Sequence, residues 1–275
     1  SGMEPLKFIR GECVEEGFYA GQATDGTIYF VKAATLFDGA IYVTCNGAKI
    51  YANSASWDGQ IKSFACHENE LFFRTKNYET EMEKIYRARF HEQTEICVEF
   101  IRDFGKNEEG EDGMMMTRKD ESGKKFTRNA WDEKEVEVGD DILWSLLVGV
   151  HRGKLIYTRN TNDKTPRVHK IYPNTILIEK PGYGCGEYCE DSSPLVFLCT
   201  EWKEMTVVNV NTKEWKNIDM RIAEDRTAEA RDSIYSIVGI HDGKMTVLGE
   251  WNGKSWLYTA ELPKGIREFE KLTPQ

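Results

Sequence analysis

The chain has 275 residues, of which 40% are hydrophobic, 12% aromatic and 30% charged, and its formal net charge is -10 at pH 7. This acidic balance argues against nucleic acid as a partner, because nucleic-acid binders gain most of their affinity from clustered lysines and arginines that neutralise phosphates. The longest nearly uninterrupted apolar run, residues 142–150, is far shorter than the roughly 20 residues of a membrane-spanning helix, so no membrane contact is expected either.

The cysteines favour a reducing compartment. There are seven, an odd number, and five of them (Cys13, Cys45, Cys66, Cys97 and Cys199) fall in strand-like apolar runs, where a thiol behaves as a small hydrophobic group. The sequence contains no Asn-x-Ser/Thr glycosylation site. We therefore expect a cytoplasmic protein, with the nucleus as the alternative. Residues 1–3 are interpreted as an expression scar followed by a native methionine.

A recurring hairpin predicts the fold. Its two best copies, residues 147–155 and 237–245, align without a gap, and both pass through Val-Gly, an apolar residue and His before a turn that ends in Gly-Lys. Related turns are predicted at residues 25–26, 68–69, 112–113, 152–153, 202–203 and 242–243, at intervals of 40 to 50 residues. A sheet-forming unit repeated at this period is typical of a β-propeller.

Strand patterns around these turns predict six blades in chain order. The expected strands are 18–23, 27–31, 41–45 and 49–53; 61–66, 71–75, 84–90 and 95–99; 114–118, 124–131 and 135–138; 143–150, 154–159, 167–172 and 175–179; 195–200, 204–210 and 214–219; and 236–240, 245–249, 255–261 and 267–271. The segment 95–99 either ends the second blade or begins the third. The acidic stretch 105–112 and the glycine-rich stretch 180–189 are expected to be loops, and 222–231 a short helix or surface excursion.

One segment, Leu6 to Cys13, precedes the first blade and needs a partner. Closed propellers usually complete the last blade with a strand from the other end of the chain, which removes an exposed sheet edge. We assign this segment to that role. The sequence thus predicts an all-β fold: a single six-bladed β-propeller over residues 1–275, built from four-stranded antiparallel blades and closed by an N-terminal strand.

Short motifs resemble interaction propellers. Residues 208–215, which run through a polar turn to Trp215, are similar to the stretch between the third and fourth strands of kelch repeats, but the chain has no Gly-Gly pair. Trp57-Asp58 and Trp131-Asp132 resemble the dipeptide that closes WD40 repeats, although the upstream Gly-His of that family is missing. The resemblance implies a divergent kelch-like or WD40-like platform for protein binding.

Carboxylates stand at the predicted start of each innermost strand, and these positions share one face of a propeller. The six are Glu16, Asp58, Glu95, Asp141, Asp191 and Asp232. Aromatic neighbours at the same positions are Phe18, Trp57, Trp144 and Tyr235. Aromatic rings stack on guanidinium groups and supply anchor area, so an acidic and aromatic rim favours a basic segment of a protein or peptide. The competing interpretation is that acids are simply common in turns.

Catalytic and metal sites are weaker interpretations. His67, His151 and His241 occupy equivalent positions in different blades, too far apart to bind one zinc ion. Cys185 and Cys189 are spaced one residue wider than a Cys-x-x-Cys motif. We therefore predict a non-catalytic binding scaffold without cofactor or metal. The alternatives are a lactonase-like or glycosidase-like hydrolase, with calcium held by Glu99 and Asp103 on an inner strand, and a structural subunit held through its blade edges or residues 222–231.

Overall fold

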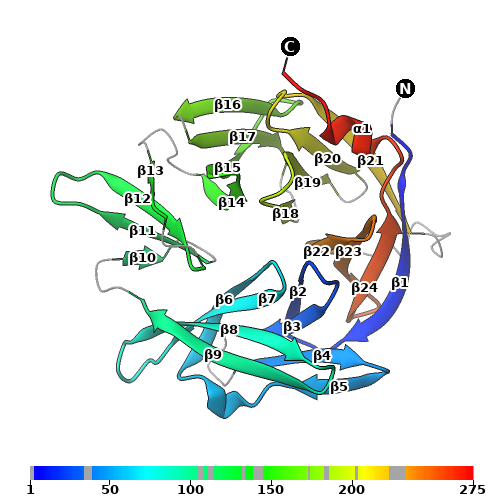
Figure 1. Ribbon diagram of the computed structural model, residues 1–275. Helices are drawn as coiled ribbons and strands as arrows, with labels where there is room; N and C mark the ends of the chain where they lie inside the picture. The colour runs from blue at the N-terminus through cyan, green and yellow to red at the C-terminus, as the bar shows by residue number, and fades with distance from the viewer. Residues whose placement is uncertain are drawn as a thin grey trace. The chain divides into compact units, whose positions relative to one another are not determined.

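The computed structural model describes residues 3–33, 39–104, 108–110, 114–131, 134–138, 145–172, 174–182, 186–201, 204–222 and 233–274. The chain divides into two compact units. One is residues 15–137, and the other combines residues 1–14 with residues 138–275. The described elements are almost entirely strands, and the fold class is that of a β-propeller, because successive four-stranded antiparallel sheets follow one another along the chain (Figure 1).

The unit of residues 15–137 contains three such sheets. Sheet 1 is β2 (Phe18–Gln22), β3 (Ile28–Lys32), β4 (Ala40–Cys45) and β5 (Ala48–Tyr51). Sheet 2 is β6 (Gln60–His67), β7 (Glu70–Lys76), β8 (Glu83–His91) and β9 (Glu95–Asp103), and a short 3-10 helix, η1 (Ser54–Ser56), precedes it. Sheet 3 is β10 (Glu108–Gly110), β11 (Met115–Lys119), β12 (Lys125–Asn129) and β13 (Val136–Val138). In each, spatial order equals chain order.

The other unit contains a four-stranded and an eight-stranded sheet. Sheet 4 is β14 (Leu146–His151), β15 (Lys154–Thr161), β16 (Arg167–Tyr172) and β17 (Thr175–Pro181). The eight-stranded sheet has two antiparallel halves. Sheet 5 is β18 (Gly186–Cys189), β19 (Leu195–Glu201), β20 (Glu204–Asn209) and β21 (Trp215–Ile222), and sheet 6 is β22 (Ser233–His241), β23 (Lys244–Trp251), β24 (Lys254–Glu261) and β1 (Leu6–Val14). The chain ends with α1 (Ile266–Glu270).

The repeated turns have the backbone conformation that their residues predict. Arg152 and Gly153 have φ of 46° and 78°, and Asp242 and Gly243 have 51° and 73°. Two central residues with positive φ form the hairpin turn whose twist matches that of the flanking strands. The turn at Trp202-Lys203 lies outside the described residues, but the strands on either side of it, β19 and β20, are the second and third of sheet 5, so it is not equivalent to the others.

The N-terminal strand completes the last sheet, as the sequence predicts. β1 pairs antiparallel with β24, with Ile9 opposite Thr259 and Arg10 opposite Tyr258. It also makes a pairing that the sequence did not indicate: Leu6 to Phe8 run parallel to β21, with Leu6 opposite Met220. Sheets 5 and 6 are therefore continuous through β1. The Arg10 guanidinium lies 3.8 Å from the centre of the Trp251 ring, a cation–π contact that fixes this strand further.

Sheet 4 corrects the predicted strand order. The third and fourth strands exchange places, so that β15 pairs parallel with β17 and β16 lies at the edge. Burial explains the exchange, since residues Thr175 to Ile178 of β17 are all buried. β16 carries Arg167, His169 and Lys170, which suit an edge strand better than an interior one.

Three further expectations are wrong. The glycine-rich loop expected over 180–189 contains a strand, β18, which becomes the first strand of sheet 5. Glu108 to Gly110, expected in a loop, pair with β11 as the first strand of sheet 3. The strand expected over 267–271 is helix α1, because β1 already holds the fourth position of sheet 6. The excursion expected over 222–231 lies outside the described residues, apart from Ile222.

Consecutive sheets of each unit pack through apolar faces. Sheets 1 and 2 share a core that includes Val31, Ile41, Ile61 and Phe73, all below 2% exposure. Sheets 4 and 5 and sheets 5 and 6 share cores of the same kind. Because each sheet covers its neighbour, strands in the middle of a sheet are apolar on both faces. No helix among the described residues is long and apolar enough to cross a membrane.

Candidate functional site

The best-defined candidate site is a groove of about 580 Å³ on sheet 2, at the end of the sheet where β6 begins. We call it the β6 groove. It is lined mainly by Trp57, Gln60, Lys76, Asn77, Tyr78 and Glu79, with η1 forming one side. These residues come from the connection into β6 and from the loop between β7 and β8. The two segments lie together because Gln60 at the start of β6 pairs with Lys76 at the end of β7.

The connection into β6 is shaped by a capped turn and a buried ring. Asn53 caps η1, and its side-chain oxygen accepts a hydrogen bond from the Ala55 amide at 3.0 Å. The chain then becomes extended at Trp57, whose ring is 8% exposed and meets Phe73 edge to face at 5.5 Å. Trp57 therefore anchors the wall of the groove in the core and contributes little exposed ring.

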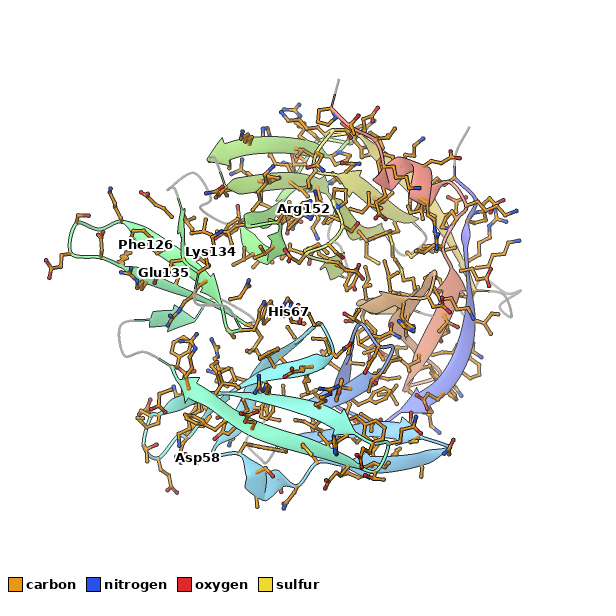
Figure 2. All side chains as sticks on the ribbon, in the orientation of Figure 1. Asp58, His67, Phe126, Lys134, Glu135 and Arg152 are labelled. Carbon is orange, nitrogen blue, oxygen red and sulfur yellow. The ribbon has the colours of Figure 1, made fainter. Side chains whose placement is uncertain are left out.

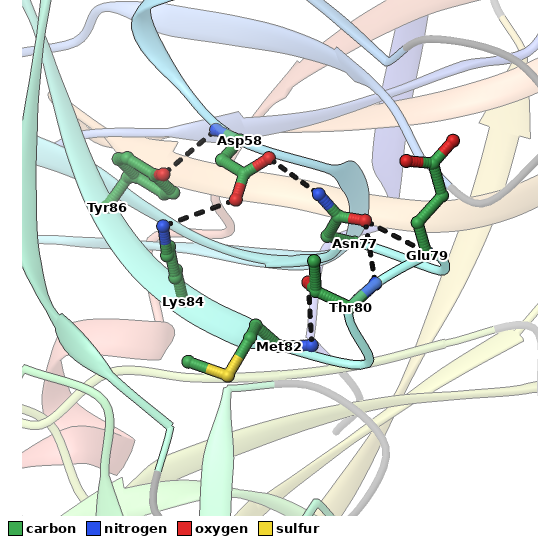
Figure 3. A network of polar contacts seen from close by, with 7 residues as sticks. All are labelled: Asp58, Asn77, Glu79, Thr80, Met82, Lys84 and Tyr86. Atoms are coloured by element: carbon green, nitrogen blue, oxygen red, sulfur yellow. Dashed lines mark hydrogen bonds and ion pairs between the residues drawn. The ribbon is translucent and has the colours of Figure 1, made fainter.

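Asp58 is the centre of a polar network that joins three segments of sheet 2 (Figure 3). Its backbone amide donates to the Tyr86 hydroxyl at 2.9 Å. Its carboxylate accepts hydrogen bonds from Asn77 Nδ2 at 2.9 Å and from Lys84 Nζ at 3.2 Å. The hydrogen bond from Asn77, and after it the one from Lys84, hold the pKa of Asp58 below its ordinary value. The hydrogen bond between Lys84 and Asp58 also raises the pKa of Lys84. Asp58 thus connects the segments on either side of the groove, and both of its carboxylate oxygens accept hydrogen bonds.

Asn77 also fixes the backbone of the loop between β7 and β8. Its side-chain oxygen accepts hydrogen bonds from the backbone amides of Glu79 at 2.9 Å and Thr80 at 3.2 Å (Figure 3). Its backbone amide donates to the Met82 carbonyl at 2.9 Å. An asparagine that bonds the amides two and three residues ahead builds a defined turn. The loop therefore presents Tyr78 and Glu79 from a fixed backbone.

The lining of the groove combines an exposed ring, Tyr78, with a carboxylate, Glu79. Tyr78 is 53% exposed. Lys76 Nζ lies 5.1 Å from the centre of the Tyr78 ring and 3.3 Å from Glu81 Oε2, so its charge is balanced locally. No described residue forms an ion pair with Glu79. The lining therefore contains an aromatic ring, amides and a carboxylate, which are groups that commonly bind a partner or ligand.

Close approach of two backbones makes Gly59 a sensitive position. Its φ is +91°, and a Cβ there would lie 2.5 Å from the backbone carbonyl carbon and oxygen of Lys76. We expect Gly59→Ala to destabilise the protein by more than about 1 kcal/mol, because the backbone must distort at an unfavourable φ. Thermal unfolding measures the effect. Gly47→Ala is the matched control, since Gly47 has a similar φ of +79° and a Cβ added there would meet nothing within 4 Å. Equal losses in the two variants would contradict the steric explanation.

Two of the predicted acids lie just before the first strand of a sheet, as expected, and two do not. Glu16 is exposed just before β2, and Asp58 lies just before β6. Glu95 begins β9, the fourth strand of sheet 2, because Glu92 and Gln93, with φ of 50° and 58°, turn β8 directly into β9. The alternative that placed Glu95 at an innermost strand is therefore wrong.

Asp191 precedes the strand predicted over 195–200, which is β19, but β19 is the second strand of sheet 5 and not its first. Asp191 follows β18, and its carboxylate accepts a hydrogen bond from the Arg152 amide at 2.9 Å. Its backbone carbonyl accepts from His151 Nδ1 at 2.8 Å. The misplacement arises because β18 was expected to be a loop. Asp191 instead joins the turn after β18 to the turn after β14 within the same unit.

The remaining rim residues are only partly described. Asp141, Trp144 and Asp232 lie outside the described residues. Tyr235 is half-buried on β22, and its hydroxyl donates to Ser255 Oγ at 3.0 Å. Phe18, like Trp57, is a core ring, and it packs edge to face on Tyr42 at 4.9 Å. The aromatic part of the predicted rim is thus largely interior in the described residues.

The residues that sequence reasoning missed are Asn77, Tyr78, Glu79 and Lys84. Their signal was modest: a turn-forming asparagine and an exposed aromatic residue follow the apolar run 71–73 after a short polar stretch. Nothing local in the sequence connects them to Asp58, since the hydrogen bonds span 19 and 26 residues.

The three repeat-equivalent histidines end the first strands of their sheets, and His67 and His151 each contact a residue of the next sheet along the chain. His67, labelled in Figure 2, stacks on Trp131 with ring centres 4.7 Å apart. His151 is 2% exposed, and burial lowers its pKa, so its ring stays neutral near pH 7. Its Nδ1 is hydrogen-bonded to the Asp191 carbonyl. Among the described residues no group of three or more His, Cys, Asp and Glu side chains is arranged to hold a metal ion.

The calcium alternative fails in its placement of two acids. Glu99 and Asp103 lie on β9, the fourth strand of sheet 2, and not on an inner strand. Glu99 Oε2 accepts hydrogen bonds from Arg87 Nη2 at 2.6 Å and Nε at 2.9 Å. A similar ion pair joins Glu135, labelled in Figure 2, to Arg118 at 2.5 Å and lowers the pKa of Glu135. Exposed acids of this unit commonly serve such cross-strand pairs.

Comparisons with known proteins assign no family. No family model matches the chain, and no curated protein matches it, so the kelch or WD40 type is not confirmed. Similar solved structures include the β-propeller domain of the Trilobed protease from Pyrococcus furiosus, 14% identical over 90% of this chain and 82% of that chain, with a TM-score of 0.41. Raptor from Chaetomium thermophilum is 8% identical over 94% of this chain and 29% of that chain, with a TM-score of 0.47. A putative oxidoreductase (glucose dehydrogenase) from Thermus thermophilus is 10% identical over 92% and 99%, with a TM-score of 0.46. At such identities and scores these similarities carry no argument about function.

Proposed function

We propose that this protein is a non-catalytic binding module, and that the β6 groove receives a basic segment of a protein or peptide partner. The observation that carries the proposal is the state of Tyr78, which is 53% exposed on a loop held by Asn77 and Asp58. A large ring that is exposed yet fixed loses little conformational entropy on binding, which is the property of an anchor residue.

Charge favours a basic partner. Glu79 stands beside Tyr78 without an ion pair to another described residue, while the cation of the groove, Lys76, is balanced by Glu81. An arginine or lysine of a partner can lie over the Tyr78 ring and approach Glu79 together. The net charge of -10 adds long-range attraction for the same segment.

The wider rim remains part of the proposal. Glu16 is exposed at the start of β2 in the same unit as the groove, and it offers a further carboxylate. Asp141, Trp144 and Asp232 stay predictions from the sequence. Asp58 changes its role in the proposal: its carboxylate is engaged by Asn77 and Lys84, so it positions the loop and does not contact the partner.

A synthetic peptide array tests the groove. Peptides of matched length with basic, neutral and acidic composition are screened, and the affinity of the best basic peptide is measured by fluorescence polarisation. We expect Tyr78→Ala to weaken binding at least tenfold, as truncation of an anchor ring does. We expect Glu79→Gln to weaken it several-fold and to reduce its dependence on salt, because one screened charge pair is lost.

Matched controls in the same unit separate the groove from general effects. Tyr19→Ala removes a ring with similar exposure, 50%, from β2, and Glu121→Gln removes an exposed carboxylate from the turn between β11 and β12. Both should bind as the unchanged protein does. If basic peptides fail to bind, or if Tyr78→Ala binds as well as Tyr19→Ala while both remain folded, the proposal is wrong.

A further inference from the structure

A second recess, of about 550 Å³, lies in the other unit, between sheet 5 and the loop that follows β15. We call it the sheet 5 recess. One wall is the face of sheet 5 that carries Glu204, Thr206, Trp215 and Asn217. The opposite wall is formed by residues 160–166 together with Pro181 and Gly182 at the end of β17. It is distinct from the β6 groove, and the inference drawn from it does not depend on the proposed function.

The sheet wall has a defined hydrogen-bonding pattern. Trp215 and Asn217 are two residues apart on β21, so their side chains point to the same face. Thr206 lies directly opposite Asn217 in the register of β20 and β21, and its hydroxyl donates to Asn217 Oδ1 at 2.9 Å. Thr206 is 2% exposed, whereas Asn217 is exposed. The oxygen of the Asn217 amide is therefore engaged, and its Nδ2 donors are left for a ligand.

Trp215 supplies an apolar platform at the edge of this pattern. Its side chain packs against the core shared by sheets 4 and 5, to which Val208 and Ile178 belong, and it also lines the recess. A half-buried indole in this position is fixed by the core on one side and available on the other. This is the tryptophan of the kelch-like segment 208–215, and the proposed binding at the β6 groove leaves it without a role.

The loop wall adds uncharged polar groups. Asn160, Thr161 and Asn162 contribute two side-chain amides and a hydroxyl to the lining. The charge of Asp163 is balanced by Arg167, whose Nη2 lies 3.0 Å from Asp163 Oδ2. The recess thus offers three asparagine amides, the Thr161 hydroxyl and an indole, with few unbalanced charges among its described residues.

We infer that the sheet 5 recess binds a neutral, hydroxyl-rich ligand of the carbohydrate class. A sugar ring has an apolar C–H face that fits an indole, and a rim of hydroxyls, each both donor and acceptor, that fits amides. Glu204 at the recess disfavours a phosphate. Lys164 on the same wall disfavours a strongly basic segment. The mixture of one aromatic platform with convergent polar groups is typical of small-ligand sites.

A glycan array tests the inference, with neutral plant and microbial oligosaccharides, N-glycans and sulfated glycans as separate arms. Calorimetry then measures the affinity of the best neutral oligosaccharide. We expect Asn217→Asp to weaken binding at least tenfold, because it keeps an acceptor for Thr206 and removes both amide donors. Asn162→Ala on the loop wall should weaken it several-fold.

Asn211→Asp is the matched control, since it makes the same chemical change on an exposed residue of the turn between β20 and β21, outside the recess lining. It should bind as the unchanged protein does, with all variants unfolding at similar temperatures. The inference is overturned if the protein binds no neutral glycan on the array or binds sulfated glycans alone. It is also overturned if the Asn217→Asp and Asn211→Asp variants bind the oligosaccharide with equal affinity.

Discussion

Replacing Phe8 by alanine should cost about 3–5 kcal/mol of unfolding free energy, the range found for large aromatic residues removed from cores. Phe8 is 0% exposed and belongs to the core that also contains Phe197, Val207 and Tyr258. It lies on β1, which pairs with β24 on one side and β21 on the other, so its loss weakens both halves of the eight-stranded sheet. Guanidinium denaturation followed by circular dichroism measures the shift of the midpoint.

The next residue provides the control. Ile9 is 56% exposed and points away from that core, since successive side chains of a strand face opposite sides. Ile9→Ala should therefore cost less than about 1 kcal/mol, the usual scale for surface substitutions. Similar losses for Phe8→Ala and Ile9→Ala would mean that β1 does not bury its alternate face, and that the terminal strand contributes little to the sheet.

The role of β1 was predictable because it follows from a general requirement. A last blade with three strands leaves an exposed edge, and a leftover apolar segment at the other terminus is the obvious partner. The hairpin turns were predictable for a local reason, since Arg152-Gly153 and Asp242-Gly243 have residues that adopt positive φ readily at the second position. The parallel pairing of Leu6 to Phe8 with β21 had no local signal.

Strand order in sheet 4 could not be predicted from local sequence patterns. β16 and β17 do form the antiparallel hairpin expected from residues 167–179. Burial decides which of the two strands lies beside β15. β17 takes the interior position because Ile176 to Ile178 are apolar, whereas β16 carries Arg167 and Lys170 and lies at the edge. A hairpin pattern predicts its own pairing but not the side on which it joins a sheet.

Of the residues that build the candidate site, the sequence pointed only to Trp57 and Asp58. Asp58 does lie at the start of β6, beside a groove, but its carboxylate holds Asn77 and Lys84. Trp57 has the right place for an anchor and is buried, because the extended backbone there turns its ring into the core. Such roles depend on contacts between residues distant in the sequence, which composition and turn patterns do not contain.

Replacing Glu187 by glutamine should cost about 3 kcal/mol, because it leaves a buried lysine without its counter-ion. Lys180 is 5% exposed at the end of β17, and its ammonium contacts Glu187 on β18. The Thr158 hydroxyl donates to the same carboxylate oxygen at 3.5 Å. The substitution keeps the shape and one oxygen acceptor, so the loss measures the uncompensated charge.

Two comparisons decide whether burial of the Lys180 charge causes the loss of stability in Glu187→Gln. Asp219→Asn breaks an exposed pair, in which Arg221 Nη2 lies 3.9 Å from Asp219 Oδ2, and it should change stability by less than about 1 kcal/mol. The double variant Lys180→Met with Glu187→Leu removes both charges and should recover most of the loss, since well-packed apolar residues often replace a buried pair at little cost. Chemical denaturation of the four proteins gives the free energies. A double variant as unstable as Glu187→Gln would show that packing around β18, and not the unpaired ammonium of Lys180, sets the cost.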